Sequence, residues 1–72
     1  MKWQHKNIGP IRYWYAYGWG NYYLVSEYSY SSYGLQIRTK RKYSKLQYIA
    51  TFWKKEEAIK VAMYIEKWRK KV

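Results

Sequence analysis

The sequence predicts an α+β fold: a three- to four-stranded antiparallel β-sheet meander with one C-terminal α-helix packed on one face. Three observations lead to this prediction. The chain has 72 residues, which leaves room for one domain with a small core. Residues 11–53 are rich in aromatic, β-branched and small side chains, interrupted by Gly and Ser. From about Lys55 onward, apolar residues recur with the period of a helix.

Residues 1–10 are mostly polar and carry no strand or helix period. We therefore expect a loosely ordered lead at 1–10 and a single β-β-β-β-α domain at 11–72. The lead lacks the apolar segment of a signal peptide, and charges interrupt every stretch that could cross a bilayer. The chain also has no cysteine, which is compatible with a reducing compartment. These features predict a cytoplasmic protein with no membrane partner.

The first two strands are expected at residues 11–17 and 22–30, where the side chains suit a pleated surface. Gly18, Gly20 and Asn21 lie between them and tolerate a positive φ, so they predict a turn between antiparallel neighbours. A second turn is expected where Ser and Gly recur at residues 31–34.

The third strand is expected at residues 35–42, because Leu35 and Ile37 alternate with polar and basic residues. A short connection leads to a fourth strand at residues 46–53, in which alternation places Tyr48 on the same buried face as Leu46, Ala50 and Phe52.

The last element is a helix whose acidic residues Glu56 and Glu57 fall in the first turn and whose final turn is basic. Its apolar residues would form one stripe against the sheet: Ala58, Val61, Ala62, Ile65, Trp68 and Val72. We expect Ile59 and Met63 to pack at the edge of this stripe.

Charge and aromatic content together indicate the class of ligand. The formal net charge is +11, and 24% of the residues are aromatic. Cations neutralise phosphates, and rings stack on bases, so this combination favours a non-enzymatic nucleic-acid-binding domain. A solvated basic surface without a partner, or one that keeps a sheet face soluble, is the alternative explanation of the charge.

The face of the sheet away from the helix is the expected contact surface. On the third strand this face would carry Gln36, Arg38, Lys40 and Lys42. On the first strand large rings occur at both alternations, and we assign Arg12 and Trp14 to the open face; on the fourth strand we assign Gln47, Ile49, Thr51 and Trp53. The predicted nucleic-acid-binding residues are Arg12, Trp14, Gln36, Arg38, Lys40, Arg41, Lys42, Lys45 and Gln47. Of these, the five cations from Arg38 to Lys45 would neutralise phosphates, Arg12 and Gln36 would meet base edges, and Trp14 would make apolar or stacking contact.

Residues 48–62 read Tyr-Ile-Ala-Thr-Phe-Trp-Lys-Lys-Glu-Glu-Ala-Ile-Lys-Val-Ala. This segment resembles the final strand and helix start of AP2-type DNA-binding domains, and related segments occur in the N-terminal arm-binding domains of tyrosine recombinases. The resemblance implies a sheet with a helix across its back and an open sheet face in the major groove, so duplex DNA is the expected ligand. It also implies that Tyr48 contributes to the DNA face, whereas strand alternation alone buries it.

Catalysis is not expected, because the chain has four glutamates, one histidine, and neither aspartate nor cysteine. These residues supply no zinc ligand set and no activated serine, so we expect no metal and no cofactor.

A protein-interaction module is the alternative function. Most of the eleven tyrosines lie in the hairpin of residues 13–33, which begins at Tyr13 and ends at Tyr33. Tyr, Trp and Arg are enriched at interface hot spots, and a homodimer through this hairpin would cover rings that one helix cannot. Single-stranded DNA or RNA, bound by stacking, is a third possibility.

Overall fold

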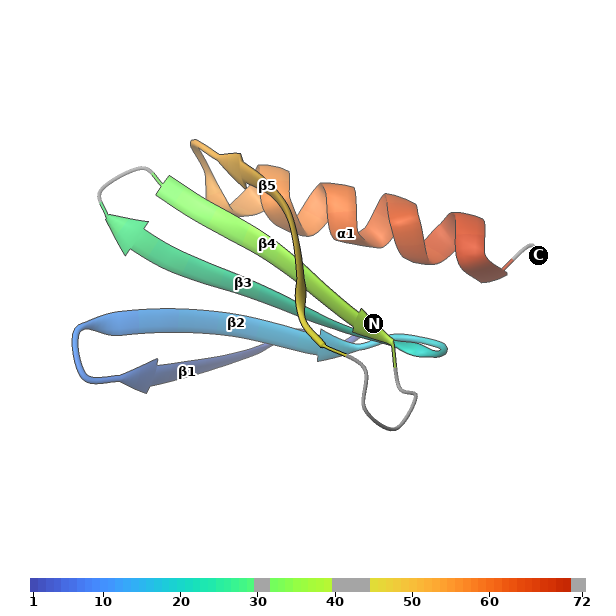
Figure 1. Ribbon diagram of the computed structural model, residues 1–72, viewed down its shortest axis with the longest axis horizontal. Helices are drawn as coiled ribbons and strands as arrows, with labels where there is room; N and C mark the ends of the chain where they lie inside the picture. The colour runs from blue at the N-terminus through green and yellow to red at the C-terminus, as the bar shows by residue number, and fades with distance from the viewer. Residues whose placement is uncertain (30–31, 40–44, 71–72) are drawn as a thin grey trace.

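The computed structural model describes residues 1–29, 32–39 and 45–70. It has a five-stranded antiparallel sheet with the strands in chain order, followed by one helix (Figure 1). The elements are β1 (Gln4–Ile8), β2 (Ile11–Tyr17), β3 (Asn21–Ser29), β4 (Ser32–Thr39), β5 (Gln47–Phe52) and α1 (Lys55–Lys70). The predicted α+β class and antiparallel meander are confirmed, with one strand more than expected.

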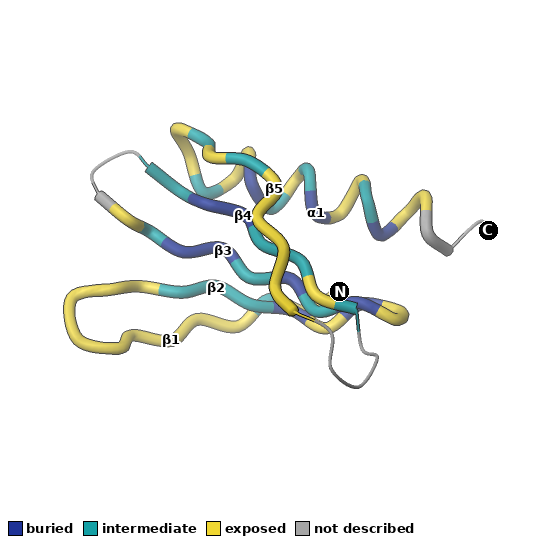
Figure 2. Tube along the Cα trace, in the orientation of Figure 1, coloured by how far each residue is buried: buried dark blue, intermediate teal, exposed yellow. Residues whose placement is uncertain are grey.

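The additional strand is β1, which lies within the lead that the sequence led us to expect as loosely ordered. Ile8 pairs with Ile11, and only Gly9 and Pro10 separate the two strands. Gly9 has a φ of 58°, which a glycine at the first central position of a tight hairpin adopts without strain. The Gly-Pro pair between two isoleucines is a turn signal that our prediction from the sequence did not use. All five residues of β1 are exposed (Figure 2).

The other boundaries agree closely with the sequence pattern. β2 spans the expected residues, β5 lies within the expected fourth strand, and the helix begins at Lys55. Between β2 and β3, Gly20 has the predicted positive φ, at 89°. The strand expected at 35–42 begins earlier, at Ser32, because Tyr33 and Gly34 still pair with both β3 and β5.

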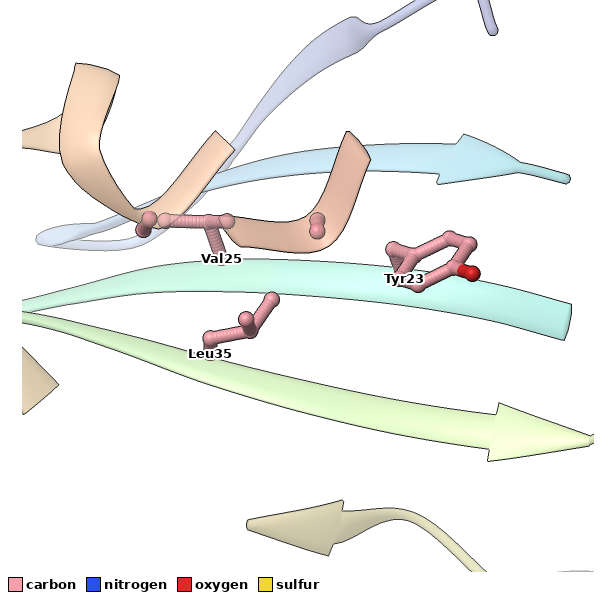
Figure 3. Packing of buried hydrophobic residues seen from close by; sticks show 5 residues of the cluster. Tyr23, Val25 and Leu35 are labelled. Carbon is pink, nitrogen blue, oxygen red and sulfur yellow. The ribbon is translucent and has the colours of Figure 1, made fainter. Parts of the chain in front are cut away.

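The hydrophobic core lies on one face of β3 and β4, next to α1. Tyr23, Val25 and Leu35 are fully buried and form one cluster with Ala58 and Ala62 of the helix. Figure 3 shows Tyr23 and Val25 of β3 beside Leu35 of β4. We call this side of the sheet the helix-side face and the opposite side the open face.

Fewer helix residues are buried in the core than the predicted apolar stripe contains. Ala58 and Ala62 are buried, and Ile65 and Ile59 pack against the cluster, but Trp68 is 54% exposed. Trp68 instead makes an edge contact with Tyr64, with ring centroids 6.0 Å apart. Val72 lies outside the described residues. Short alanines allow the helix backbone to approach the strands closely, which leaves the longer side chains at the rim.

A buried carboxylate joins the helix to the β2–β3 turn. Glu66 of α1 is 6% exposed and accepts hydrogen bonds from the Trp19 backbone N–H at 2.5 Å and the Tyr23 hydroxyl at 2.8 Å. A Cβ at position 18 would lie 2.3 Å from its Oε1, so Gly18 is needed for this close approach. Asn21 donates to the Tyr23 hydroxyl at 3.2 Å. This network fixes the hairpin relative to the end of the helix.

Candidate nucleic-acid interface

Strand register determines which side chains share the open face. Cross-strand partners point to the same side of a sheet, and Tyr22 is adjacent in sequence to the buried Tyr23, so Tyr22 points to the open face. Its partners, Tyr17 on β2 and Arg38 on β4, lie there with it. The same reasoning across the sheet places the following side chains on this face: Lys6, Ile8, Tyr13, Tyr15, Tyr17, Tyr22, Leu24, Gln36, Arg38, Tyr48 and Thr51.

Tyrosine rings contact one another across β2 and β3. The Tyr17 and Tyr22 centroids are 5.0 Å apart at an interplanar angle of 45°, and Tyr15 lies 6.3 Å from Tyr22. The Arg38 guanidinium carbon is 5.0 Å from the Tyr22 centroid, a favourable cation–π distance. One positive charge is thus held against the edge of a continuous aromatic surface.

These rings line a groove of about 370 Å³. Its walls come from three neighbouring strands: Lys6, Ile8, Tyr13, Tyr15, Tyr17, Tyr22 and Leu24. Tyr15 donates a hydrogen bond to Gln4 Oε1 at 3.2 Å, which orients that ring at the groove. Burial raises the pKa of the Tyr22 hydroxyl, and nearby Tyr17 raises it further, whereas Arg38 lowers it. The Tyr22 hydroxyl is therefore neutral at physiological pH and can donate a hydrogen bond.

A second aromatic feature lies toward the other end of the face. A Cβ on Gly34 would be 2.2 Å from Cε2 of Tyr28, so the Tyr28 ring lies directly over this glycine. Tyr28 remains 56% exposed. On β5, the hydroxyls of Tyr48 and Thr51 share a hydrogen bond. The open face thus carries exposed rings on β2, β3 and β5, at Tyr17, Tyr28 and Tyr48.

The predicted placement of Gln36 and Arg38 on the open face is confirmed, since both alternate with Leu35 on the buried side. Arg38 is exposed and Gln36 is partly buried. Lys40, Arg41 and Lys42 lie outside the described residues.

The expected placement of Arg12 and Trp14 is wrong. Trp14 pairs with the buried Val25 and packs against the core cluster, so both side chains lie on the helix-side face. The physical reason is Ala16, which is the cross-strand partner of Tyr23 and is 1% exposed. This small side chain leaves space for the Tyr23 ring to reach Glu66, and it forces Arg12 and Trp14 onto the same side.

On the helix-side face, the Arg12 guanidinium forms an ion pair with Glu27. It does not lie on the open face, where we expected it from the sequence. Its Nε and Nη2 donate to the two carboxylate oxygens of Glu27, at 2.9 and 2.6 Å. The hydrogen bond from Arg12 lowers the pKa of the Glu27 carboxyl, and a second one from Tyr33 acts in the same direction. An arginine already engaged by a carboxylate is poorly suited to read a base edge.

Trp14 is also engaged on this side. His5 of β1 stacks on it, with centroids 5.1 Å apart and 18° between the planes. The Lys55 ammonium lies 5.1 Å from the Trp14 ring centroid. The Trp14 ring is therefore in contact with an imidazole and with two cations, Lys55 and Arg12.

The assignment of β5 is wrong in its first half. Gln47 pairs with Ile37 and Tyr48 pairs with Gln36, and the register shifts between Leu35 and Gln36. This irregularity inserts one residue into β5, so Gln47 lies on the helix-side face and Tyr48 on the open face. Tyr48 is 56% exposed, contrary to its expected burial. Lys45 is exposed and lines a hollow of about 290 Å³ together with Gln47 and Ile65.

Sequence reasoning missed the tyrosines that dominate the open face. The signal that could have found them is the single alanine of β2, because Ala16 marks the strand alternation that must fit beneath the helix. Tyr13, Tyr15 and Tyr17 then fall on the opposite side.

No family model, curated protein or solved structure matches the chain. Within the described ranges, no group of His, Cys, Asp and Glu side chains is arranged to hold a metal ion. The part of the chain that is described also contains no helix with the length and apolar character needed to span a membrane.

Proposed function

We propose that this chain is a small, non-enzymatic nucleic-acid-binding domain and that the open face of its sheet is the contact surface. The observation that carries the proposal is the array of exposed tyrosine rings on this face, with Arg38 packed on Tyr22. Rings and cations on one surface suit a ligand with bases and phosphates.

The charge of the whole chain supports the same ligand. A formal net charge of +11 on 72 residues gives a long-range attraction for polyanions. Arg38 is near the end of β4, and in the sequence it precedes the basic residues Lys40, Arg41 and Lys42. Phosphate contacts are therefore expected on the side of the open face where β4 ends.

The exposed rings also fit a second function, that of a protein-interaction module. Tyr17, Tyr28 and Tyr48 are each more than half exposed, and rings of this kind form hot spots in protein interfaces. A homodimer through the hairpin of residues 13–33 would use the same surface. The salt dependence of the affinity distinguishes the two functions, because binding to phosphates weakens steeply as the salt concentration rises.

The test is a fluorescence anisotropy titration with labelled random-sequence duplex DNA, single-stranded DNA and RNA across a salt series. The variant Arg38→Gln/Lys40→Gln/Lys42→Gln should weaken binding and flatten the salt dependence. A matched control is Lys54→Gln/Lys60→Gln/Lys67→Gln, which removes the same charge from exposed positions at and near the helix. Equal losses in the two variants would show that only net charge matters, and absence of binding near physiological salt would overturn the proposal.

A further inference from the structure

We infer that the open face binds single-stranded nucleic acid in preference to duplex DNA, with bases stacked on the tyrosines of the groove. This inference rests on the proposed function and specifies its ligand. It departs from the duplex DNA that the sequence favours.

The groove presents aromatic surface to the solvent. Four of its lining residues are the tyrosines 13, 15, 17 and 22, and Tyr17 is 58% exposed. The bases of a duplex are stacked on one another and offer only their edges to a protein, whereas an unpaired base offers its face. An aromatic groove can therefore form more stacking contacts with a single strand than with a duplex.

The geometry of the rings suits stacking by more than one base. Tyr17 and Tyr22 are tilted by 45°, and Tyr15 meets Tyr17 edge-on at 85° with centroids 6.4 Å apart. These rings form a stepped surface and not one flat sheet of aromatic carbon. A flexible single strand can follow such steps, while the regular stack of a duplex cannot.

Cations lie at two ends of the tyrosine cluster: Lys6 lines the groove, and Arg38 packs on the Tyr22 ring. Lys6 is the cross-strand partner of Tyr13, at one end of the tyrosine row of β2. Arg38 is the partner of Tyr22, which pairs with Tyr17 at the other end. Lys6 is on β1 and Arg38 is on β4. Three inter-strand spacings separate them, which is about 14 Å across the sheet. A single-stranded nucleic acid that crosses the tyrosine rings diagonally would meet a positive charge at each end of its path.

Residues proposed to read duplex edges are scarce on this face. Of the two residues proposed to meet base edges, Arg12 is held by Glu27 on the helix-side face, and Gln36 lies on the open face. Among the described residues proposed for polar contacts, Gln36 and Arg38 remain on the open face. The open face thus offers more aromatic rings for stacking than side chains proposed to form hydrogen bonds with base edges.

The experiment compares the affinities of short oligothymidylate, oligouridylate and a duplex of equal length for the wild-type chain and for Tyr15→Leu/Tyr17→Leu. Because stacking on an aromatic side chain contributes about 1–3 kcal/mol per base, we expect the leucine variant to bind single strands about 5- to 150-fold more weakly for each base that loses its stacking ring. Tyr15→Phe/Tyr17→Phe keeps the rings and should retain most of the affinity. Tyr64→Leu, which removes a ring that is 59% exposed on the helix, is the matched control.

The outcomes separate the inference from the proposed function. A preference for duplex, with loss of binding on Arg38→Gln but not on the leucine variant, would overturn the inference and leave the proposed function standing. Absence of binding to all three probes would overturn both. Equal affinity for oligothymidylate and oligouridylate would support stacking without contact to the 2′-hydroxyl or the thymine methyl group, and a preference for one would show that the face contacts one of these two groups.

A second measurement does not depend on variants that fold. In an NMR titration of ¹³C-labelled tyrosine with oligothymidylate, ring signals of Tyr15, Tyr17 and Tyr22 should shift, while those of Tyr64 should not. Shifts confined to Tyr64 would contradict the inference.

Discussion

Two adjacent tyrosines on β3 show how differently the two faces of one sheet use the same side chain. Tyr23 is fully buried beside the helix, and its hydroxyl donates to the carboxylate of Glu66. Tyr22 points to the open face, where its ring contacts Tyr17 and Arg38. The side of the strand, and not the residue type, determines whether a tyrosine stabilises the fold or remains available to a ligand.

The same contrast extends over the whole sheet. The helix-side face buries a compact set of apolar side chains with a hydrogen-bonded carboxylate at one end. The open face keeps large rings in partial contact with water. Substitutions on the first face should therefore change stability, and substitutions on the second should change binding.

Leu35→Ala should give the largest effect, because Leu35 is fully buried in the core cluster. Truncating a buried leucine costs about 2–5 kcal/mol, a large part of the stability of a small domain. The matched substitution is Leu24→Ala on the open face, where the side chain is only partly buried, and its cost should be less than half as great. Urea denaturation of both variants measures the difference, and equal losses would contradict the distinction between the faces.

Tyr23→Phe and Tyr22→Phe test the comparison most directly, since each removes one hydroxyl and keeps the ring. Without the Tyr23 hydroxyl, the buried Glu66 loses a donor and Asn21 loses an acceptor. A hydrogen bond to a charged group contributes about 1.5–3 kcal/mol, and we expect a loss of stability in this range. Tyr22→Phe should change the free energy of unfolding by less than about 0.5 kcal/mol. Thermal unfolding followed by circular dichroism should show a larger loss of stability for Tyr23→Phe than for Tyr22→Phe.

Glu27→Gln should alter the dependence of stability on pH. The pKa of Glu27 is lowered in the folded protein by the hydrogen bond from Arg12, so the ion pair stabilises the fold above the ordinary glutamate pKa of 4.5. This contribution is lost as the pH falls through the lowered pKa of the folded state. The melting temperatures of wild type and variant should differ near neutral pH and converge in acid. A difference independent of pH would show that the variant acts through packing.

Arg38→Gln should have the smallest effect on stability, because the side chain is exposed on the open face. Its expected effect is on binding: each phosphate contact removed reduces the log–log salt slope by about 0.7 for a single strand or about 0.9 for a duplex. Lys60→Gln on the outer side of the helix should leave the slope unchanged. An anisotropy titration at several salt concentrations measures both slopes.

Local patterns predicted much of this fold. The alternation of Leu35 and Ile37 with polar residues identified β4 and its buried side correctly, and the helix begins at the expected Lys55. Both predictions depend on periodicity within a few residues. Strand β1 was missed because four of its five residues are polar and all five are exposed. It is held in the sheet by its pairing with β2.

The candidate site was predicted in part. Gln36 and Arg38 lie on the expected face, whereas Arg12, Trp14 and Gln47 lie on the other. On β2 both alternations contain large rings, so hydrophobic pattern alone could not choose between them. On β5, one inserted residue reverses the alternation in the first half of the strand.

By itself, the sequence determined the class of the fold, most strand boundaries, the helix and the strong positive charge, since each depends on composition or on neighbouring residues. Tertiary structure decided which tyrosines became core and which became surface. The reason is physical: a ring is buried only if a partner from another element covers it, and the space under α1 admits Ala16 beside Tyr23 but not a second row of tyrosines.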